Sequence, residues 1–253
     1  MLEHNYYAYR KSMKPILIIK TGSTSPTIAA RHGDYEDWII SGMQIAEINF
    51  VVVAPFMGEP LPREKEFSGV VITGSRFMVT EPEAWTNETI RWLREAVSRP
   101  IPILGICYGH QLIAHAMGGK VDYHPKGREI GSVEVTKTLV AEDDLLFRDL
   151  PSKFDVYVSH LQSVLRIPPN SKVLASNGFE PHQAFVLNNH VWGVQFHPEF
   201  NENIMRESII EQKDILQNEG YDIPQLISSL RPCPYGKFLL KRFSEIIIEF
   251  DKA

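Results

Sequence analysis

Short unbroken runs of aliphatic residues recur through the first half of the chain. They occupy residues 16–19, 50–53, 70–72 and 101–106, and each of the first three is soon followed by a turn-forming residue such as Gly22, Pro55 or Gly74. Runs of this kind are typical of strands that are covered on both faces, as in a parallel sheet. The pattern therefore predicts four buried strands.

Elsewhere, apolar residues are spaced as on the buried face of a helix. The spacing i, i+4, i+7, i+8, i+11 holds both for Trp85, Thr89, Trp92, Leu93 and Ala96 and for Leu239, Phe243, Ile246, Ile247 and Phe250. The first set predicts a helix over 83–98, and the second predicts an amphipathic C-terminal helix that packs back on the domain. A further helical stretch, 108–117, is closed by two glycines. Strands that alternate with helices indicate the α/β class.

The segment from about 121 to 194 has a different pattern. Short alternating stretches at 132–136, 154–158 and 191–196 are separated by turn residues such as Asn177-Gly178, which indicates β structure. We predict that this half folds over one edge or end of the parallel sheet.

These patterns predict one α/β domain over residues 13–253. Its fold class is an open, mostly parallel sheet with helices on both faces, a small antiparallel β region and C-terminal helices, which form an extension over 201–253. Residues 1–12 are expected to be a loosely attached leader, because Met13 stands directly before the first apolar run.

Composition narrows the class of protein. With 253 residues, 43% of them hydrophobic and 23% charged, the chain fits a globular domain rather than a disordered or fibrous one. Its formal charge of -5 argues against a surface for nucleic acid, and no apolar run approaches the roughly 18 residues of a membrane span. Two cysteines, Cys107 and Cys233, cannot hold together a fold of this size, so we expect a reduced, cytoplasmic location.

Cys107 has the sequence context of a nucleophile. It lies in Gly105-Ile106-Cys107-Tyr108-Gly109, between an apolar strand and a helix, which is the setting of a nucleophile elbow. The two glycines are needed because the flanking backbone segments of such a tight turn approach closely. The unpaired N–H groups at a helix N-terminus favour the thiolate, which is the attacking species. The alternative is a buried cysteine that acts as a small apolar residue.

His197-Pro198-Glu199 supplies a base and a group to orient it. His197 follows the apolar strand at 191–196, so it lies at the strand's carboxyl end, where open α/β sheets collect their active sites. Pro198 biases His197 towards an extended conformation, in which residues i and i+2 share a face. The Glu199 carboxylate is therefore expected to reach the imidazole and fix its tautomer. Alone, these residues could equally be a solvated strand end.

Together, Gly-Ile-Cys-Tyr-Gly-His-Gln and Val-Gln-Phe-His-Pro-Glu-Phe, about 90 residues apart, strongly resemble the class I (triad) glutamine amidotransferases. The resemblance is close to the glutaminase domain of GMP synthetase and runs from about residue 16 to 200. It implies the flavodoxin-like sheet of that family. It also implies Cys107 as the nucleophile that forms a γ-glutamyl thioester, His197 as general base and then acid, and Glu199 as the orienting group.

The resemblance also suggests an oxyanion hole. The elbow offers the Tyr108 backbone N–H, and Thr73-Gly74-Ser75 occupies the place of the family loop that supplies a second donor. A fixed donor at this point contributes roughly 2.7 to 4 kcal/mol to acyl transfer. Because this sequence has Gly74-Ser75 where the synthetase domain has two glycines, either residue could present the inward N–H, and a plain turn is the alternative.

Substrate contacts are implied at four positions. Gln111 in the elbow motif and Ser159-His160-Leu161, which resembles the family's Ser-His-Gly segment, would bind the α-amino and α-carboxylate groups of glutamine. Leu161 replaces the usual glycine and could reshape the pocket, which puts strict glutamine specificity in question. The segment 126–131 resembles a further part of the family pocket, with a solvated turn as the equal alternative.

Other chemistries have weaker support in the sequence. His110 and His115 are five residues apart on one helix and do not form an i, i+4 metal pair, so no metal is predicted. Cys233 lies between prolines without a nearby base, which favours an inert thiol. No glycine-rich phosphate motif indicates a nucleotide, so no cofactor is predicted.

Three functions remain open at this point. The first is hydrolysis of the γ-amide of glutamine or a related γ-glutamyl compound through a cysteine thioester; the second is a γ-glutamyl peptidase, as similar stand-alone plant proteins suggest. The third is a binding or regulatory module without catalysis, against which the three triad residues argue. About 50 residues follow Glu199 without an ATP-binding motif, so we expect a stand-alone hydrolase or a subunit that delivers ammonia to a synthetase.

Overall fold

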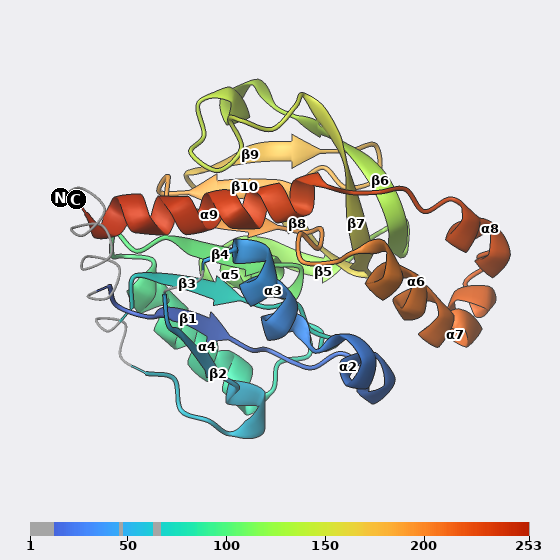
Figure 1. Ribbon diagram of the computed structural model, residues 1–253, viewed down its shortest axis with the longest axis horizontal. Helices are drawn as coiled ribbons and strands as arrows, with labels where there is room; N and C mark the ends of the chain where they lie inside the picture. Colours follow the sequence, from blue (N-terminus) through green and yellow to red (C-terminus); the bar gives the residue numbers. More distant parts are fainter. Residues whose placement is uncertain (1–12, 46–47, 63–66, 253) are drawn as a thin grey trace.

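The computed structural model describes residues 13–45, 48–62 and 67–252, and the expected leader over 1–12 lies outside them. The strands are β1 (Ile16–Ile19), β2 (Phe50–Val53), β3 (Gly69–Ile72), β4 (Ile103–Ile106), β5 (Lys120–Tyr123), β6 (Glu129–Lys137), β7 (Lys153–His160), β8 (Gln162–Arg166), β9 (Ser171–Ser176), β10 (Ala184–Leu187) and β11 (Val191–Val194). The helices are α2 (Pro26–His32), α3 (Tyr35–Met43), α4 (Ala84–Ala96), α5 (Tyr108–Ala116), α6 (Glu202–Glu211), α7 (Lys213–Asn218), α8 (Ile223–Ser228) and α9 (Tyr235–Asp251). The main sheet runs through the centre of the domain (Figure 1).

The main sheet has nine strands in the order β2-β1-β3-β4-β11-β10-β9-β6-β7. The first five strands are parallel to one another. Each neighbouring pair from β11 to β7 is antiparallel. The predicted fold class is confirmed. One detail differs: the antiparallel strands continue the main sheet instead of folding over it, and β5 and β8 form a separate two-stranded sheet.

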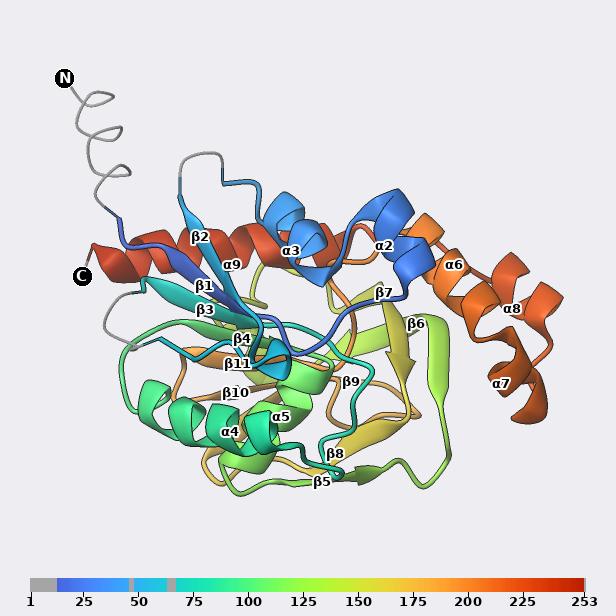
Figure 2. The same cartoon turned by 90° about the horizontal axis from the view of Figure 1, so that it is seen from below.

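Helices cover the parallel strands on both faces. In β1, Ile16 and Ile18 pack in the same core cluster as residues of α3 and α9, whereas Leu17 and Ile19 pack with residues of α4 and α5. Successive side chains of a strand point to opposite faces, so a continuous aliphatic run is needed to fill both clusters. Figure 2 shows α3 and α9 on one face of the sheet and α4 and α5 on the other.

The strand at 50–53 is an exception to the predicted burial. β2 ends the sheet, and its Val51 and Val52 are 37% and 39% exposed. The prediction of a strand is correct, but the prediction that both faces are covered is wrong. An aliphatic run marks the strand without revealing its position in the sheet, because neighbours far along the chain decide which strand lies at the edge.

Strand order brings the two candidate motifs together. β4 and β11 are adjacent and parallel, with Ile106 opposite Val194, and the Cys107 N–H donates to the Val194 carbonyl at 2.8 Å. The segments that follow both strands therefore begin at the same edge of the sheet. β3, on the other side of β4, ends there too.

The C-terminal helices pack in two places. α9 lies on the main sheet, with Leu239, Phe243, Ile246 and Ile247 fully buried, as its spacing predicts. The helices α6, α7 and α8 lie at one end of the domain beside α2 (Figures 1 and 2). A separate apolar cluster joins them to α2, α3, β6 and β7.

Candidate active site

Cys107 sits in a strained turn between β4 and α5. Its backbone angles are φ 50 and ψ -98, a region that side chains rarely adopt. A Cβ at Gly105 would lie 2.5 Å from the Gly109 carbonyl, and one at Gly109 would lie 2.4 Å from the carbonyl oxygen of Ile72. The local sequence folds this way because both glycines let the backbone segments meet. The structure therefore has the elbow geometry that the glycine spacing predicts.

His197 and Glu199 form a buried pair just after β11. The His197 Nδ1 atom is 2.8 Å from Glu199 Oε1, and the two side chains are 4% and 0% exposed. The Phe200 ring stacks on the imidazole with centroids 4.1 Å apart, and the backbone N–H of His197 donates to the Tyr157 carbonyl. These contacts fix the ring and leave Nε2 for another partner.

Electrostatic contacts couple His197 to both other members of the predicted triad. Burial alone would lower the pKa of His197, but the electrostatic effect of Glu199 and then that of Cys107 outweigh it. Together they raise the pKa to about 10. The arrangement therefore favours the protonated imidazole, which is a proton donor at neutral pH.

A glutamine that the motif analysis did not single out contacts the sulfur. Gln195 Nε2 donates to Cys107 Sγ at 3.5 Å, and Gln195 Oε1 accepts from Gln111 Nε2 at 3.0 Å. The same Gln111 nitrogen also donates to the Gln162 carbonyl at 2.8 Å. Gln111 thus lines the pocket, and its amide nitrogen orients Gln195. Its predicted contact with substrate stays a prediction.

The loop after β3 lies beside both reacting groups. A Cβ built on Gly74 would be 3.0 Å from His197 Cε1 and 3.7 Å from Cys107 Cβ. The Gly74 carbonyl accepts from the Thr73 hydroxyl at 2.9 Å and lies 3.2 Å from the Thr21 hydroxyl. Because a trans peptide directs its C=O and N–H oppositely, these contacts turn the Ser75 N–H away from the two threonines. Of the two loop N–H groups, that of Ser75 is therefore the better candidate, and its role in an oxyanion hole with the Tyr108 N–H stays a prediction.

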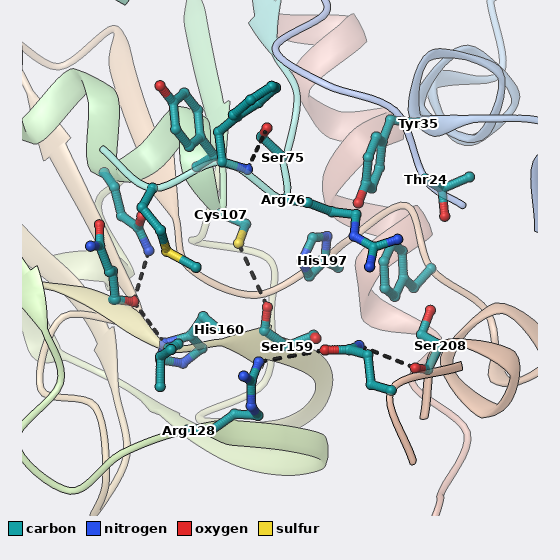
Figure 3. Close-up of a pocket in the computed structure, with 18 of the residues that line it drawn as sticks. Thr24, Tyr35, Ser75, Arg76, Cys107, Arg128, Ser159, His160, His197 and Ser208 are labelled. Carbon is teal, nitrogen blue, oxygen red and sulfur yellow. Dashed lines mark hydrogen bonds between the residues drawn. The ribbon is translucent and has the colours of Figure 1, made fainter. Parts of the chain in front are cut away.

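The predicted site residues gather around one pocket (Figure 3). All ten except Glu199 and Gly74 line it; Glu199 lies behind His197, and Gly74 packs against the imidazole. The Ser159 carbonyl accepts from Cys107 Sγ at 3.9 Å, and Leu161 lines the same cavity. The pocket therefore gathers residues that lie far apart in the chain.

His160 is fixed by a buried polar cluster. Its Nε2 is 2.9 Å from Glu129 Oε2, which also accepts from Gln183 Nε2 at 2.8 Å. Asn177 donates to the other Glu129 oxygen at 2.7 Å. The segment 126–131, whose role the sequence leaves open, therefore braces His160 through Glu129, while Arg128 lines the pocket itself.

Several pocket residues were not predicted from the sequence. Phe200 stacks on His197 and Tyr35 lies beside both rings, Arg76 follows the loop after β3, and Glu211 and Gln212 come from the end of α6. Arg76 could have been found from its place directly after Ser75. The helical residues could not, because only the packing of α6 against the domain brings them to the site.

The remaining candidates lie apart from the pocket. Cys233 is partly buried, and burial raises the pKa of its thiol to about 12. His110 is fully buried against Phe185, and burial lowers its pKa to about 3. Within the described ranges, no group of three or more His, Cys, Asp or Glu residues could hold a metal ion. Over the same ranges, none of the helices has the length and apolar content to cross a membrane.

Comparisons with known proteins identify the family. The family model for "Glutamine amidotransferase class-I" matches residues 35–215. The chain is 40% identical over 143 residues to a glutamine-hydrolysing GMP synthase from Aeropyrum pernix, covering 56% of this chain and 26% of that protein. It is 30% identical over 153 residues to gamma-glutamyl peptidase 4 from Arabidopsis thaliana, covering 58% of this chain and 61% of that one.

A solved structure has the same fold. The crystal structure of a glutamine amidotransferase from Thermotoga maritima superposes with a TM-score of 0.75 at 24% identity, covering 93% of this chain and 99% of that one. The likeness to that structure concerns the fold alone, whereas the family model covers most of the chain and includes both Cys107 and His197. The chain therefore belongs to the class I glutamine amidotransferase family.

Proposed function

We propose that this protein hydrolyses the γ-amide bond of glutamine or a related γ-glutamyl compound through a thioester on Cys107. One observation carries the proposal: His197, whose Nδ1 atom is 2.8 Å from Glu199 Oε1, lines the same pocket as Cys107. Nothing in the packing of the domain requires a buried imidazole between a carboxylate and a thiol. Membership in a family that includes glutamine-hydrolysing enzymes supports it.

The reaction begins with attack of the Cys107 thiolate on the γ-carbonyl carbon. The carbonyl π electrons move to the oxygen, where the N–H groups of Tyr108 and Ser75 stabilise the negative charge. When the C–N bond breaks, the His197 imidazolium gives its proton to the leaving nitrogen. Water then attacks the thioester with His197 as base, which releases glutamate and restores the thiolate. Glu199 holds the imidazole in position throughout.

Cys107→Ala tests the proposal, with Cys233→Ala as the matched control. Glutamate release from glutamine and from γ-glutamylglycine reports both candidate leaving groups with one product. Cys107→Ala is expected to lower kcat on the order of 10,000-fold, whereas Cys233→Ala keeps the wild-type rate. Labelling by 6-diazo-5-oxo-L-norleucine should modify Cys107 alone. Wild-type activity in Cys107→Ala, or labelling at Cys233 instead, would contradict the assignment.

A γ-glutamyl peptidase is the second candidate, and Leu161 favours it. This leucine lines the pocket at the position where the family has glycine, so the cavity departs from the family's glutamine site. The similarity to an Arabidopsis γ-glutamyl peptidase points the same way. Glycine release from γ-glutamylglycine, compared with ammonia release from glutamine, separates the two. Absence of both, with no labelling of Cys107, would favour a non-catalytic module.

For the glutaminase alternative, we propose that a separate synthetase chain accepts the ammonia. The Aeropyrum relative is a GMP synthase of which this chain spans 26%. A partner that couples ammonia use to its own reaction should raise the kcat of glutamine hydrolysis when it is added with its substrates. If glutamine is a poor substrate both with and without such a chain, this alternative is excluded.

A further inference from the structure

One wall of the pocket is made by helices that lie outside the sheet. Ser208, Glu211 and Gln212 line the pocket from α6 and its C-cap, and Ile215 does so from α7. The apolar cluster that joins these helices to α2 and α3 holds the wall in place. The groups on this wall therefore face whatever is bound at Cys107.

Two arginines face the pocket, and they are paired very differently. Arg128 is only 12% exposed in its side chain and binds both oxygens of Glu219, at 2.8 and 3.1 Å. The Arg76 side chain is 58% exposed, and its ion-pair partner among the described residues is Glu211, at an N–O distance of 3.6 Å. A distance of 3.6 Å is too long for a hydrogen bond, and an exposed ion pair contributes little. The Arg76 guanidinium is thus able to exchange Glu211 for an incoming carboxylate.

Arg76 lies on the side of the site where the leaving group must be. His197 donates the proton to the departing nitrogen, so the atoms attached to that nitrogen lie on the His197 side of Cys107. Figure 3 shows Arg76 and Ser208 on that side, whereas His160 lies on the other side of Cys107. The glutamyl end, for which the resemblance implies contacts to Ser159, His160 and Gln111, is correspondingly directed away from Arg76.

We propose that the substrate is a γ-glutamyl amino acid or peptide whose leaving half carries a free carboxylate, and that Arg76 binds that carboxylate in place of Glu211. In a γ-glutamyl amino acid the carboxylate carbon is two bonds from the leaving nitrogen, close to the group that His197 protonates. Planar guanidinium groups bind carboxylates through paired N–H donors. The inference rests on the proposed thioester chemistry and names the substrate class of that same site.

Three substrates that release the same product test the inference: γ-glutamylglycine, γ-glutamylglycine amide and glutamine. Replacing the terminal carboxylate by an amide removes one charge with almost no change in size. The wild-type kcat/KM should be about tenfold higher for the free acid than for the amide. This ratio corresponds to the low end of the free energy of a hydrogen bond between charged groups, because Arg76 is partly exposed. Arg76→Met should abolish this preference by lowering the kcat/KM for the free acid to about that for the amide.

Two further variants separate a specific contact from a general effect of charge. Arg31→Met removes another arginine that pairs with α6, through Glu207 at 3.5 Å, but Arg31 does not line the pocket. This control should keep the wild-type preference. Glu211→Gln frees the Arg76 guanidinium, so the preference should be kept or increased.

The outcomes distinguish a failure of the proposed role of Arg76 from a failure of the proposed thioester chemistry. Equal kcat/KM for the acid and the amide in the wild type, or a preference that survives in Arg76→Met, would overturn the role of Arg76 while the thioester mechanism stands. Loss of the preference in Arg31→Met or Glu211→Gln would also overturn it. If none of the three substrates releases glutamate and Cys107 is not labelled, the proposed function fails and the inference fails with it.

Discussion

Glu199→Gln removes the charge that faces His197 while keeping the size of the side chain. The carboxylate is fully buried, Nδ1 lies 2.8 Å from Oε1, and within the described residues Oε2 has no hydrogen-bond partner. Two charges about 4 Å apart near a protein surface interact by about 4 kcal/mol, which corresponds to a pKa change of roughly three units. We therefore expect the pKa of His197 to fall by about two to three units in the variant.

The pH profile of kcat/KM measures this fall. Since the imidazolium protonates the leaving nitrogen, activity should be lost at alkaline pH as His197 deprotonates. The wild-type alkaline limb should lie near pH 10, the value to which the pKa of His197 is raised. In Glu199→Gln it should move about two to three units lower. Glutamate release between pH 5.5 and about 10.5 measures the alkaline limb of the wild type and that of the variant, for which the residual activity is used.

Thermal unfolding checks the same interaction without catalysis. A raised pKa stabilises the folded state fully below the unfolded value of His, about 6.5, and this stability is lost as the pH rises through the folded value. The difference in Tm between wild type and Glu199→Gln should therefore be largest near pH 6.5 and shrink towards pH 10.

Glu207→Gln is the matched control for both measurements. Glu207 pairs with His32 at 3.0 Å, but both side chains are about a quarter exposed, so solvent weakens the interaction. Its profile should be close to that of the wild type. An alkaline limb that does not move in Glu199→Gln, or a Tm difference that is the same at pH 6.5 and 10, would refute the reasoning.

Three further predictions concern the elbow and the loop beside it. Cys107→Gly should be more stable than Cys107→Ala by about 1 kcal/mol in denaturant unfolding, because glycine relieves the positive φ although it is more flexible when unfolded. Gly105→Ala should destabilise the fold by at least about 2 kcal/mol, since its Cβ would meet backbone at 2.5 Å, whereas Gly178→Ala, with open space around it, should change stability by less than about 0.5 kcal/mol. Thr73→Val removes a hydroxyl that holds the Gly74 carbonyl, so steady-state kinetics should show kcat lowered about tenfold with KM unchanged, and Thr73→Ser should restore it.

The core strands of the parallel sheet could be predicted because each carries its own signal. A strand buried on both faces needs a continuous aliphatic run, as at 16–19 and 70–72. A helix buried along one side needs apolar residues at the helical period, as at 239–250. Both patterns can be read from local sequence. The helices α2 and α3 were missed between the first two strands. Their caps, Ser25 and Asp34, accept hydrogen bonds from backbone N–H groups and were the available signal.

The triad is predicted from two short motifs, because each motif satisfies a strict local demand. The glycines around Cys107 permit close backbone contact, and the spacing of His197 and Glu199 in an extended segment lets the side chains meet. The role of Gln195 was not found, although it stands in the same motif as His197. A glutamine has no particular chemistry until its contact with the sulfur at 3.5 Å is known.

Local sequence was enough to predict the fold class, the family and the residues with reactive side chains, because strand runs, glycine spacing and the two motifs depend on neighbours in the chain. Tertiary structure alone decided that β4 and β11 lie side by side, which carries Cys107 to the imidazole about 90 residues away. It also decided that β2 is the exposed edge and that α6 carries Glu211 to Arg76. Contacts between distant segments are set by how whole faces pack, and no single stretch of sequence records that geometry.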